Sequence, residues 1–213
     1  MQRLLASSTK ATAYKICEPK MCPNPCDVFI NHRGIDTKRT ISGLLYNHFT
    51  RLKLNAFLDN KSMKPGDRLF GEIDAAIRGC GVGIAVFSPR YCDSYFCLHE
   101  LALLMESKKR VIPIFYDVKP SQLSVQDDGK RPASEIERFR WALEEAKYTV
   151  GLTFDSSNGN WSELLEMASE AVTKNLVEVE EEKQRGMNPT YTHMARYVNP
   201  NTLLKVRRIF SLL

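Results

Sequence analysis

The stretch VGIAVFSPRYCDSYFCLHELALLMESKKRVIPIFYDV, residues 82–118, decides the fold because it places a helix between two buried strands. Within it, IAVF and VIPIFY are almost entirely apolar, as strands covered on both faces must be. Residues 95–109 between them have the length and apolar content of a buried helix. A strand, a helix and a second strand in this order indicate parallel pairing with a right-handed crossover.

The same alternation continues on both sides of this unit. Upstream, the strand-like runs DVFIN and NAFLD alternate with helical segments near residues 38–52 and 69–78. Downstream, residues 139–148 predict a helix, residues 149–154 an edge strand, and residues 161–176 a closing amphipathic helix. We therefore predict an α/β fold, a flavodoxin-like three-layer sandwich with about five parallel strands and helices on both faces.

Three segments follow from this pattern. The predicted domain covers residues 27–176, preceded by a flexible N-terminal tail at residues 1–26. Residues 177–213 read as a C-terminal tail, in which TLLKVRRIFSLL has the pattern of a short basic helix.

Composition excludes several classes of protein. The net charge of +5 is spread along the chain, and its basic clusters resemble no nucleic-acid motif, so no nucleic-acid partner is expected. The six cysteines lack CxxC and zinc spacings, which predicts reduced thiols and no metal. No apolar run approaches the roughly 18 residues of a membrane span. The start of the chain has the composition of a transit peptide only weakly, so we expect a cytoplasmic or nuclear protein rather than import into an organelle.

Glu100 stands out because it lies in the most apolar helical segment. Between residues 95 and 105 only His99 and Glu100 are polar, and Phe96 shares a helical face with Glu100. A carboxyl group among apolar neighbours resists ionisation unless a partner or a cationic ligand compensates. The alternative is that Glu100 caps amides near the helix start, and the residue pattern alone favours that alternative.

The loops that follow the strands are the expected ligand-binding region. In open parallel sheets, ligands bind beyond the carboxyl ends of the strands, where the strand order reverses. The loops to consider are therefore residues 31–36, 60–66, 88–94 and 117–125.

Four strings together resemble plant TIR (Toll/interleukin-1 receptor-like) domains of the type without nucleotide-binding or leucine-rich-repeat domains. DVFINHRGIDT is similar to the family's DVFLSFRGEDTR, and FLDNKSMKPGDRL to its second strand and BB loop. AVFSPRYCDSYFCLHEL is similar to its third strand and third helix, which usually ends WCLxEL, and VIPIFYDVKPSQL to its fourth strand and loop. The resemblance covers about residues 27–176.

The resemblance implies an enzyme of immune signalling that cleaves NAD⁺ on self-association. In plant TIR domains the glutamate of CLxEL is catalytic, and that residue here is Glu100. Nicotinamide leaves as a neutral molecule, so the site must mainly stabilise an oxocarbenium-like ribose. Attack by water gives ADP-ribose, and attack by a nitrogen of the adenine gives a cyclic product. NAD⁺ or NADP⁺ is thus expected as substrate, with no permanently bound cofactor.

The resemblance also implies binding residues. Arg33 would supply positive charge to the pyrophosphate beside Gly34, and Phe96 would stack where the family usually has Trp. The alternatives are a surface ion pair for Arg33, a tight turn at Gly34 and a core position for Phe96. Further substrate-binding candidates follow the third strand: Ser88, Arg90 and Tyr91.

Partners would be other TIR domains, since in this family the BB loop of one domain approaches the site of another. Lys64, Pro65 and Gly66 would have that role here, although Pro and Gly also form ordinary turns.

Three departures from the family support a rival function. Ser42 and Gly43 stand where the family often has a Ser-His pair for self-association, Phe96 replaces Trp, and residues 126–146 look short. The rival is a catalytically weak TIR adaptor or decoy that acts through TIR–TIR binding. A third alternative is a nucleotide-binding flavodoxin-like module without turnover.

Overall fold

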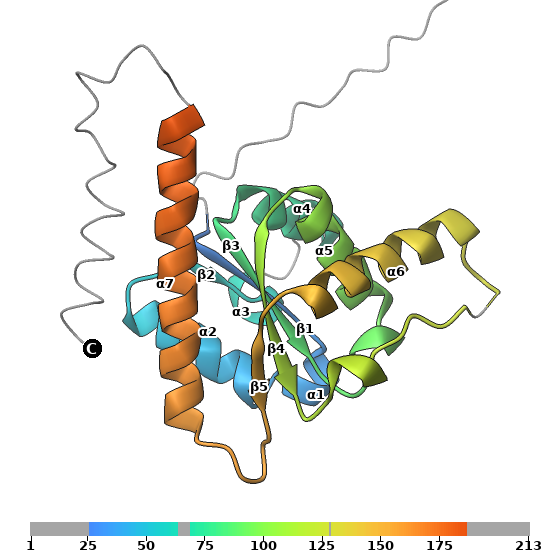
Figure 1. Ribbon diagram of the computed structural model, residues 1–213, viewed down its shortest axis with the longest axis horizontal. Helices are drawn as coiled ribbons and strands as arrows, with labels where there is room; N and C mark the ends of the chain where they lie inside the picture. Colours follow the sequence, from blue (N-terminus) through green and yellow to red (C-terminus); the bar gives the residue numbers. More distant parts are fainter. Residues whose placement is uncertain (1–25, 64–68, 128, 187–213) are drawn as a thin grey trace, which may run out of the picture.

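The computed structural model describes residues 26–63, 69–127 and 129–186, which form a parallel sheet between two layers of helices (Figure 1). In the described residues the strand order is β2-β1-β3-β4-β5, and every pair is parallel. This order confirms the predicted flavodoxin-like fold. The strands are β1 (Val28–His32), β2 (Ala56–Phe57), β3 (Val82–Phe87), β4 (Arg110–Tyr116) and β5 (Leu152–Phe154).

The helices lie on both faces of the sheet (Figure 1). One buried cluster joins the sheet to α4, α5 and α6, and a second joins its other face to α2 and α7. The described helices are α1 (Gly34–Thr37), α2 (Ile41–Arg51), α3 (Asp59–Ser62), α4 (Leu69–Gly79), α5 (Tyr95–Glu106), α6 (Ala133–Tyr148) and α7 (Trp161–Gly186), with 3₁₀ turns at Tyr91–Asp93 and Pro120–Gln122.

The central strands are buried on both faces, as their apolar sequences predict. In β3, Ala85 and Phe87 pack towards α5, whereas Ile84 and Val86 pack towards α2 and α7. Gly83 permits the close approach of α5, because a Cβ atom there would lie 2.9 Å from a methyl carbon of Leu104. The helix that carries Glu100 is therefore held tightly against the centre of the sheet.

Helix α5 begins at a well-defined cap. The Ser94 hydroxyl accepts a hydrogen bond from the backbone N–H of Cys97 at 3.3 Å. Leu98, Leu101 and Leu104 then face the core and are buried. Capping and burial together fix the rotation of the helix, and they leave Glu100 in its second turn.

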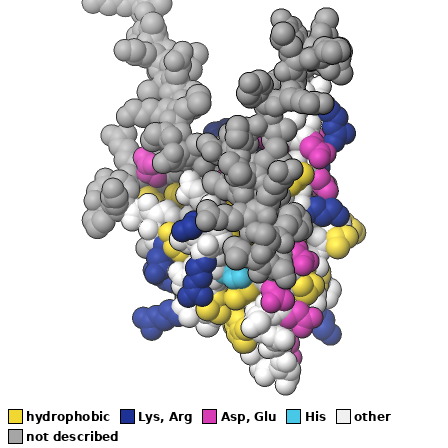
Figure 2. Space-filling view, turned by 90° about the vertical axis from the view of Figure 1, so that its left-hand side faces the viewer, with side chains coloured by type: hydrophobic (Ala, Val, Ile, Leu, Met, Phe, Trp, Pro, Cys, Tyr) yellow, Lys and Arg dark blue, Asp and Glu magenta, His cyan; other side chains and the backbone are white. Residues whose placement is uncertain are grey.

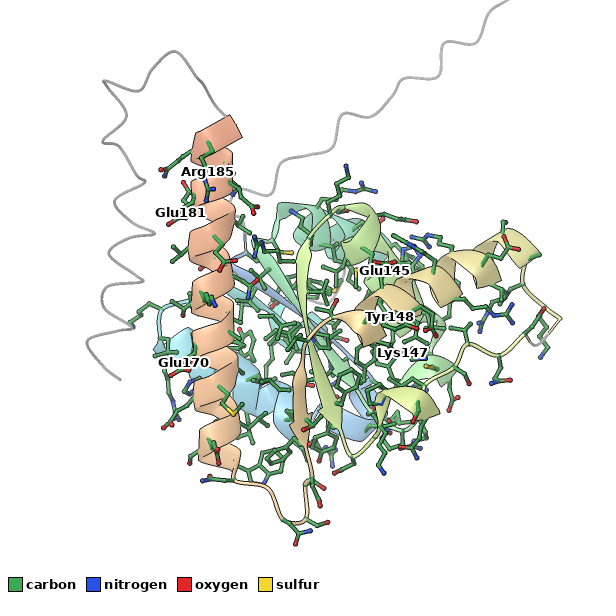
Figure 3. All side chains as sticks on the ribbon, viewed as in Figure 1. Glu145, Lys147, Tyr148, Glu170, Glu181 and Arg185 are labelled. Carbon is green, nitrogen blue, oxygen red and sulfur yellow. The ribbon has the colours of Figure 1, made fainter. Side chains whose placement is uncertain are left out.

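Helix α7 is longer than the sequence pattern indicates. The closing helix was predicted to end at residue 176, but α7 continues to Gly186 through the acidic stretch assigned to a tail. Ion pairs explain the extension, because the Arg110 guanidinium contacts the carboxylates of Glu178 and Glu182, the latter at 2.6 Å. Glu181 and Arg185 form a further pair at 3.2 Å near the helix end (Figure 3).

Helix α6 also differs from its prediction, since it begins at Ala133 rather than at residue 139. The predicted N-terminal tail up to residue 25, the basic helix near the C-terminus and the BB-loop residues Lys64, Pro65 and Gly66 lie outside the described residues.

Figure 2 looks onto the side of the molecule that carries α7, where basic, acidic and hydrophobic side chains are mixed. Exposed apolar side chains of this helical layer include Leu44 of α2 and Met167 of α7. Within the described ranges, no helix combines the length and apolarity needed to cross a bilayer.

Candidate active site

The order of the strands reverses between β1 and β3, and the loops beyond these two strands meet there. Asp36 of α1 joins them, because its carboxylate accepts a hydrogen bond from the Ser88 hydroxyl at 2.7 Å and another from Arg90 Nε at 2.8 Å. Ser88 and Arg90 follow β3 directly. The hydrogen bonds of Asp36 therefore connect the two loops at the predicted ligand-binding edge of the sheet.

Glu100 is hydrogen-bonded to Asn31, the penultimate residue of β1, near this edge of the sheet. Asn31 is fully buried, and its amide nitrogen donates to Glu100 Oε2 at 2.8 Å and to the Cys97 carbonyl at 3.2 Å. Its amide oxygen accepts from the Tyr91 hydroxyl. Since these contacts use both amide protons and occupy the oxygen, they fix the orientation of Asn31 and thereby the position of the Glu100 carboxyl.

The Glu100 carboxyl is held close to neutral at physiological pH. Burial raises its pKa to about 8, the hydrogen bond from Asn31 opposes this shift, and the charges of Asp59 and Asp74 add to it. None of the ion pairs found among the described residues involves Glu100. A cationic ligand would therefore stabilise the ionised Glu100 carboxylate, for which the described residues provide no positively charged partner.

The capping alternative for Glu100 is wrong. Ser94 caps α5, and the Glu100 side chain instead accepts a hydrogen bond from Asn31. A half-buried carboxyl with a raised pKa at the strand-order reversal is the type of group that occurs in functional sites.

Arg33 and Gly34 follow β1 directly, at the start of α1. Arg33 Nε is buried without a hydrogen-bond partner among the described residues. No ion pair of Arg33 is found there, so the alternative of a surface ion pair for Arg33 is not supported. The Arg33 charge reaches Cys97 of α5, where it opposes the burial that raises the thiol pKa to about 12. Gly34 lacks a positive φ, and a Cβ there would meet no atom within 4 Å, so a strained turn does not explain the glycine.

The three candidates after β3 have different positions. Ser88 and Tyr91 are fully buried, so their predicted direct contact with a substrate does not fit the structure. Ser88 instead supports Asp36, and Tyr91 orients Asn31. Arg90 is exposed, but its guanidinium is engaged with the Asp36 carboxylate.

Phe96 lies at the surface, which makes the core alternative wrong. Its side chain is 43% exposed and stacks on Phe70 of α4, with ring centroids 5.4 Å apart. Because Phe96 precedes Glu100 by four residues on one helix, the two side chains share a face. The stacked rings therefore offer an apolar surface beside the carboxyl.

Sequence reasoning missed Asn31, Asp36 and Asp59 as contributors to this site. Asn31 had a detectable signal, since it is a polar residue within the apolar strand run DVFIN. Asp36 lies in a loop that was expected to bind ligand, whereas Asp59 lies just before such a loop, and nothing in the sequence showed which charges either residue would face. Among the described residues, no group of three or more His, Cys, Asp or Glu side chains could hold a metal ion.

Two departures from the family pattern can be placed in the structure. Ser42 is buried and donates to the Thr37 hydroxyl at 3.0 Å, so it joins α1 to α2. A Cβ at Gly43 would lie 3.0 Å from the Lys38 carbonyl oxygen, which explains a small residue there. Among the described residues between β4 and α6, the only regular element is the 3₁₀ turn Pro120–Gln122.

Comparisons with known proteins agree with this geometry. Residues 26–190 match the model of the TIR domain family. A probable 2′ cyclic ADP-D-ribose synthase, BdTIR of Brachypodium distachyon, is 52% identical over 163 residues, which cover 75% of this chain and 73% of that protein. The TMV resistance protein N of Nicotiana glutinosa is 38% identical over 141 residues, which cover 59% of this chain but 12% of that protein.

Among solved structures, the TIR domains of the activated Roq1 resistosome, which directly recognises the pathogen effector XopQ, superpose with a TM-score of 0.60. That alignment has 28% sequence identity and covers 69% of this chain and 99% of the other. The sequence match and the shared architecture lead to one conclusion. The chain belongs to the TIR domain family.

Proposed function

We propose that this protein cleaves NAD⁺ at the bond between nicotinamide and ribose, with Glu100 as the catalytic residue, and that it acts in plant immune signalling. The observation that carries the proposal is the Glu100 carboxyl, which Asn31 holds at the strand-order reversal without a cationic partner among the described residues. The relative BdTIR, named a probable 2′ cyclic ADP-D-ribose synthase, supports the same chemistry.

The electrostatics of the site suit a cationic substrate. The nicotinamide ring of NAD⁺ is positively charged, and its charge passes to the ribose as nicotinamide leaves. A bound cation lowers the pKa of the Glu100 carboxyl, because it favours the ionised form. The carboxylate that results stabilises the oxocarbenium-like ribose in a partly desolvated site, where charge interactions are strong. Nicotinamide departs as a neutral base, so this step needs no general acid.

Arg33, Gly34 and Phe96 would bind the rest of the substrate. Arg33 has a buried Nε–H without a hydrogen-bond partner among the described residues and a positive charge that suits pyrophosphate, whereas Arg90 is already paired with Asp36. The open space above Gly34 allows phosphate to approach the backbone. Phe96 and Phe70 offer stacked rings for nicotinamide or adenine.

Association between copies would complete the enzyme. The Roq1 resistosome contains TIR domains in an activated assembly, which supports TIR–TIR contact as the activating event. Leu44 and Met167 are exposed on the helical layer of α2 and α7 and are available to such a contact. Lys64, Pro65 and Gly66 would approach the site of a neighbouring copy. We further propose that the protein acts in the cytoplasm or nucleus.

The test is the release of nicotinamide from NAD⁺ by concentrated protein. Glu100→Gln should abolish release, whereas Glu106→Gln is the matched control, because Glu106 lies on the same helix but pairs with Arg138 away from the site. Equal release by wild type and Glu100→Gln would refute the catalytic role.

The adaptor or decoy function predicts a different outcome. The crowded position of Gly43 favours it, since the histidine that the family often uses for self-association cannot enter without movement of the Lys38 carbonyl. Absence of nicotinamide release from the wild type, together with measurable association with other TIR domains by light scattering, would establish that function instead.

A further inference from the structure

An arginine followed by a serine three residues later is the pattern that many Ser/Thr kinases recognise, because their substrate grooves carry acidic side chains. The pattern occurs three times in this chain, ending at Ser42, Ser134 and Ser211. Ser42 is fully buried and donates its hydroxyl to Thr37 at 3.0 Å, so a kinase cannot reach it in the folded protein. Ser211 lies outside the described residues. Of the two patterns that the structure describes, the one that ends at Ser134 is accessible.

Ser134 lies in the first turn of α6, and its side chain is exposed. Figure 1 shows the start of α6 at the rim of the molecule, away from the strands. The preceding residues 129–132 have no regular secondary structure. A kinase binds its substrate as an extended segment, and only the first turn of α6 has to unwind to provide one. Such end turns fray readily, so the cost of binding is small.

Arg131 provides the positive charge of the pattern. Its guanidinium carbon lies 5.7 Å from the centre of the Tyr95 ring. None of the ion pairs found among the described residues involves Arg131. Because a cation–π contact near the surface is weak, Arg131 can leave the ring for an acidic groove.

Arg138 lies one turn beyond Ser134, on the same face of α6. Its guanidinium joins α6 to α5, because Nε donates to Glu106 Oε1 at 2.5 Å and Nη2 donates to Oε2 at 2.8 Å. The remaining nitrogen, Nη1, lies 3.4 Å from Nδ1 of His99, the residue before Glu100. One cation on α6 therefore contacts two residues of the helix that carries Glu100.

We infer that Ser134 is a phosphorylation site for a Ser/Thr kinase that selects arginine, and that the added phosphate draws Arg138 away from Glu106. In the transfer, the Ser134 hydroxyl oxygen bonds to the γ-phosphorus of ATP, and the bond from that phosphorus to the bridging oxygen breaks. ADP leaves with the electron pair of that bond, and the hydroxyl proton passes to the catalytic aspartate of the kinase. This inference does not depend on the proposed cleavage of NAD⁺.

The phosphate should win the competition for Arg138 because of its charge. A phosphoserine carries about −1.5 to −2 charges at neutral pH and three acceptor oxygens, whereas the Glu106 carboxylate carries a single charge. A guanidinium can donate two parallel hydrogen bonds to either partner. Glu135 and Glu137 flank Ser134 and would repel the phosphate, so an arginine within reach is needed to hold it. The exchange would release Glu106 and His99 and loosen the contact between α6 and α5.

The first experiment treats the purified protein with ATP and a calcium/calmodulin-dependent kinase, a probe that selects arginine three residues before serine. Mass spectrometry should assign phosphate to Ser134 in the wild type, and Ser134→Ala should lack it. Arg131→Gln should slow the transfer to Ser134 by about tenfold or more, the usual effect of losing a charged hydrogen bond. Both changes are at the start of α6, so circular dichroism should show the wild-type fold.

Ser42 is the matched control, because it has the same pattern but is buried. Synthetic peptides of residues 36–45 and 129–138 should both accept phosphate, since each contains the pattern. The folded protein should carry phosphate on Ser134 and none on Ser42.

The second experiment follows the Glu106 carboxyl carbon by NMR during an acid titration. In the untreated protein, the hydrogen bond from Arg138 lowers the pKa of the Glu106 carboxyl. Phosphorylation should raise that pKa, because Arg138 moves to the phosphate. In Arg138→Gln, phosphorylation should leave the Glu106 pKa nearly unchanged, which separates the exchange of Arg138 from simple repulsion by the phosphate.

Two outcomes would overturn the inference. One is phosphate on the peptide that contains Ser134 but none on Ser134 in the folded protein. The other is a Glu106 pKa that stays low in the phosphorylated wild type, or that rises equally in the wild type and in Arg138→Gln. Neither experiment measures nicotinamide release, so failure here leaves the proposed function to its own test.

Discussion

Glu100→Gln should make the protein more stable while it removes the proposed activity. The amide keeps an oxygen that can accept the hydrogen bond from Asn31, but it carries no charge to desolvate. In the wild type, the carboxyl pKa rises from 4.5 in the unfolded chain to about 8 in the folded protein. A raised carboxyl pKa contributes stability that is present below pH 4.5 and lost as the pH rises through about 8.

The size of the effect follows from the two pKa values. Each unit corresponds to about 1.4 kcal/mol, so ionisation of Glu100 lowers the wild-type free energy of unfolding by at most about 3.5 kcal/mol at pH 7. Above pH 8 the loss approaches about 5 kcal/mol. The Gln variant does not titrate. Since the Glu100 side chain is partly exposed, solvent screening makes these values upper bounds.

The assay is urea unfolding followed by circular dichroism at about pH 5, pH 7 and pH 8.5. The variant should gain stability over the wild type as the pH rises. Glu106→Gln is the control with the opposite sign, because the bond to Arg138 lowers the pKa of the Glu106 carboxyl. That carboxylate contributes stability at neutral pH, which is lost as the pH falls, so its removal should destabilise. If the gap between Glu100→Gln and the wild type does not widen towards alkaline pH, the carboxyl is not held near neutrality.

Three further changes test other parts of the structure. Arg33→Gln should raise the KM for NAD⁺ by about tenfold or more, the usual effect of losing a charged hydrogen bond, with little change in urea unfolding. Ser94→Ala removes the cap of α5 and should lower the free energy of unfolding by about 1 kcal/mol, measured by urea unfolding. Gly83→Ala places a methyl group 2.9 Å from the Leu104 side chain and should destabilise by about 1 to 3 kcal/mol; an unchanged melting temperature would show that α5 can move away.

The layers of the fold could be predicted from the sequence because a strand that is buried on both faces has an almost entirely apolar sequence. IAVF and VIPIFY are almost entirely apolar, and both form central strands. The ends of helices were harder to predict. The extension of α7 depends on ion pairs between Arg110 and glutamates that are distant from it in the sequence. The residue pattern within the helix cannot predict such long-range pairs.

The site was predictable to a similar degree. Glu100 was visible as a carboxyl in an apolar helix, and its raised pKa agrees with that pattern. The pattern could not reveal that Tyr91 supports Asn31 from within the core, because a tyrosine after a strand reads equally well as exposed. Nor could it show that Arg90 is paired with Asp36 while Arg33 is not, since both arginines follow strands at the same edge.

The two ends of the described fold leave it from one side, and this has a practical use. Asp27 precedes β1, and Leu176 of α7 lies close to it. Both residues lie next to Gly81, because a Cβ atom there would contact the Leu176 side chain and the Asp27 carbonyl oxygen. The backbone N–H of Val82 also donates to that carbonyl. Arg110, at the start of β4, ties the rest of α7 to the same edge. Glu100 faces the other edge. A biosensor surface that captures the domain by a tag at either end would present the Glu100 edge outwards, free for nucleotides and for a second copy in solution.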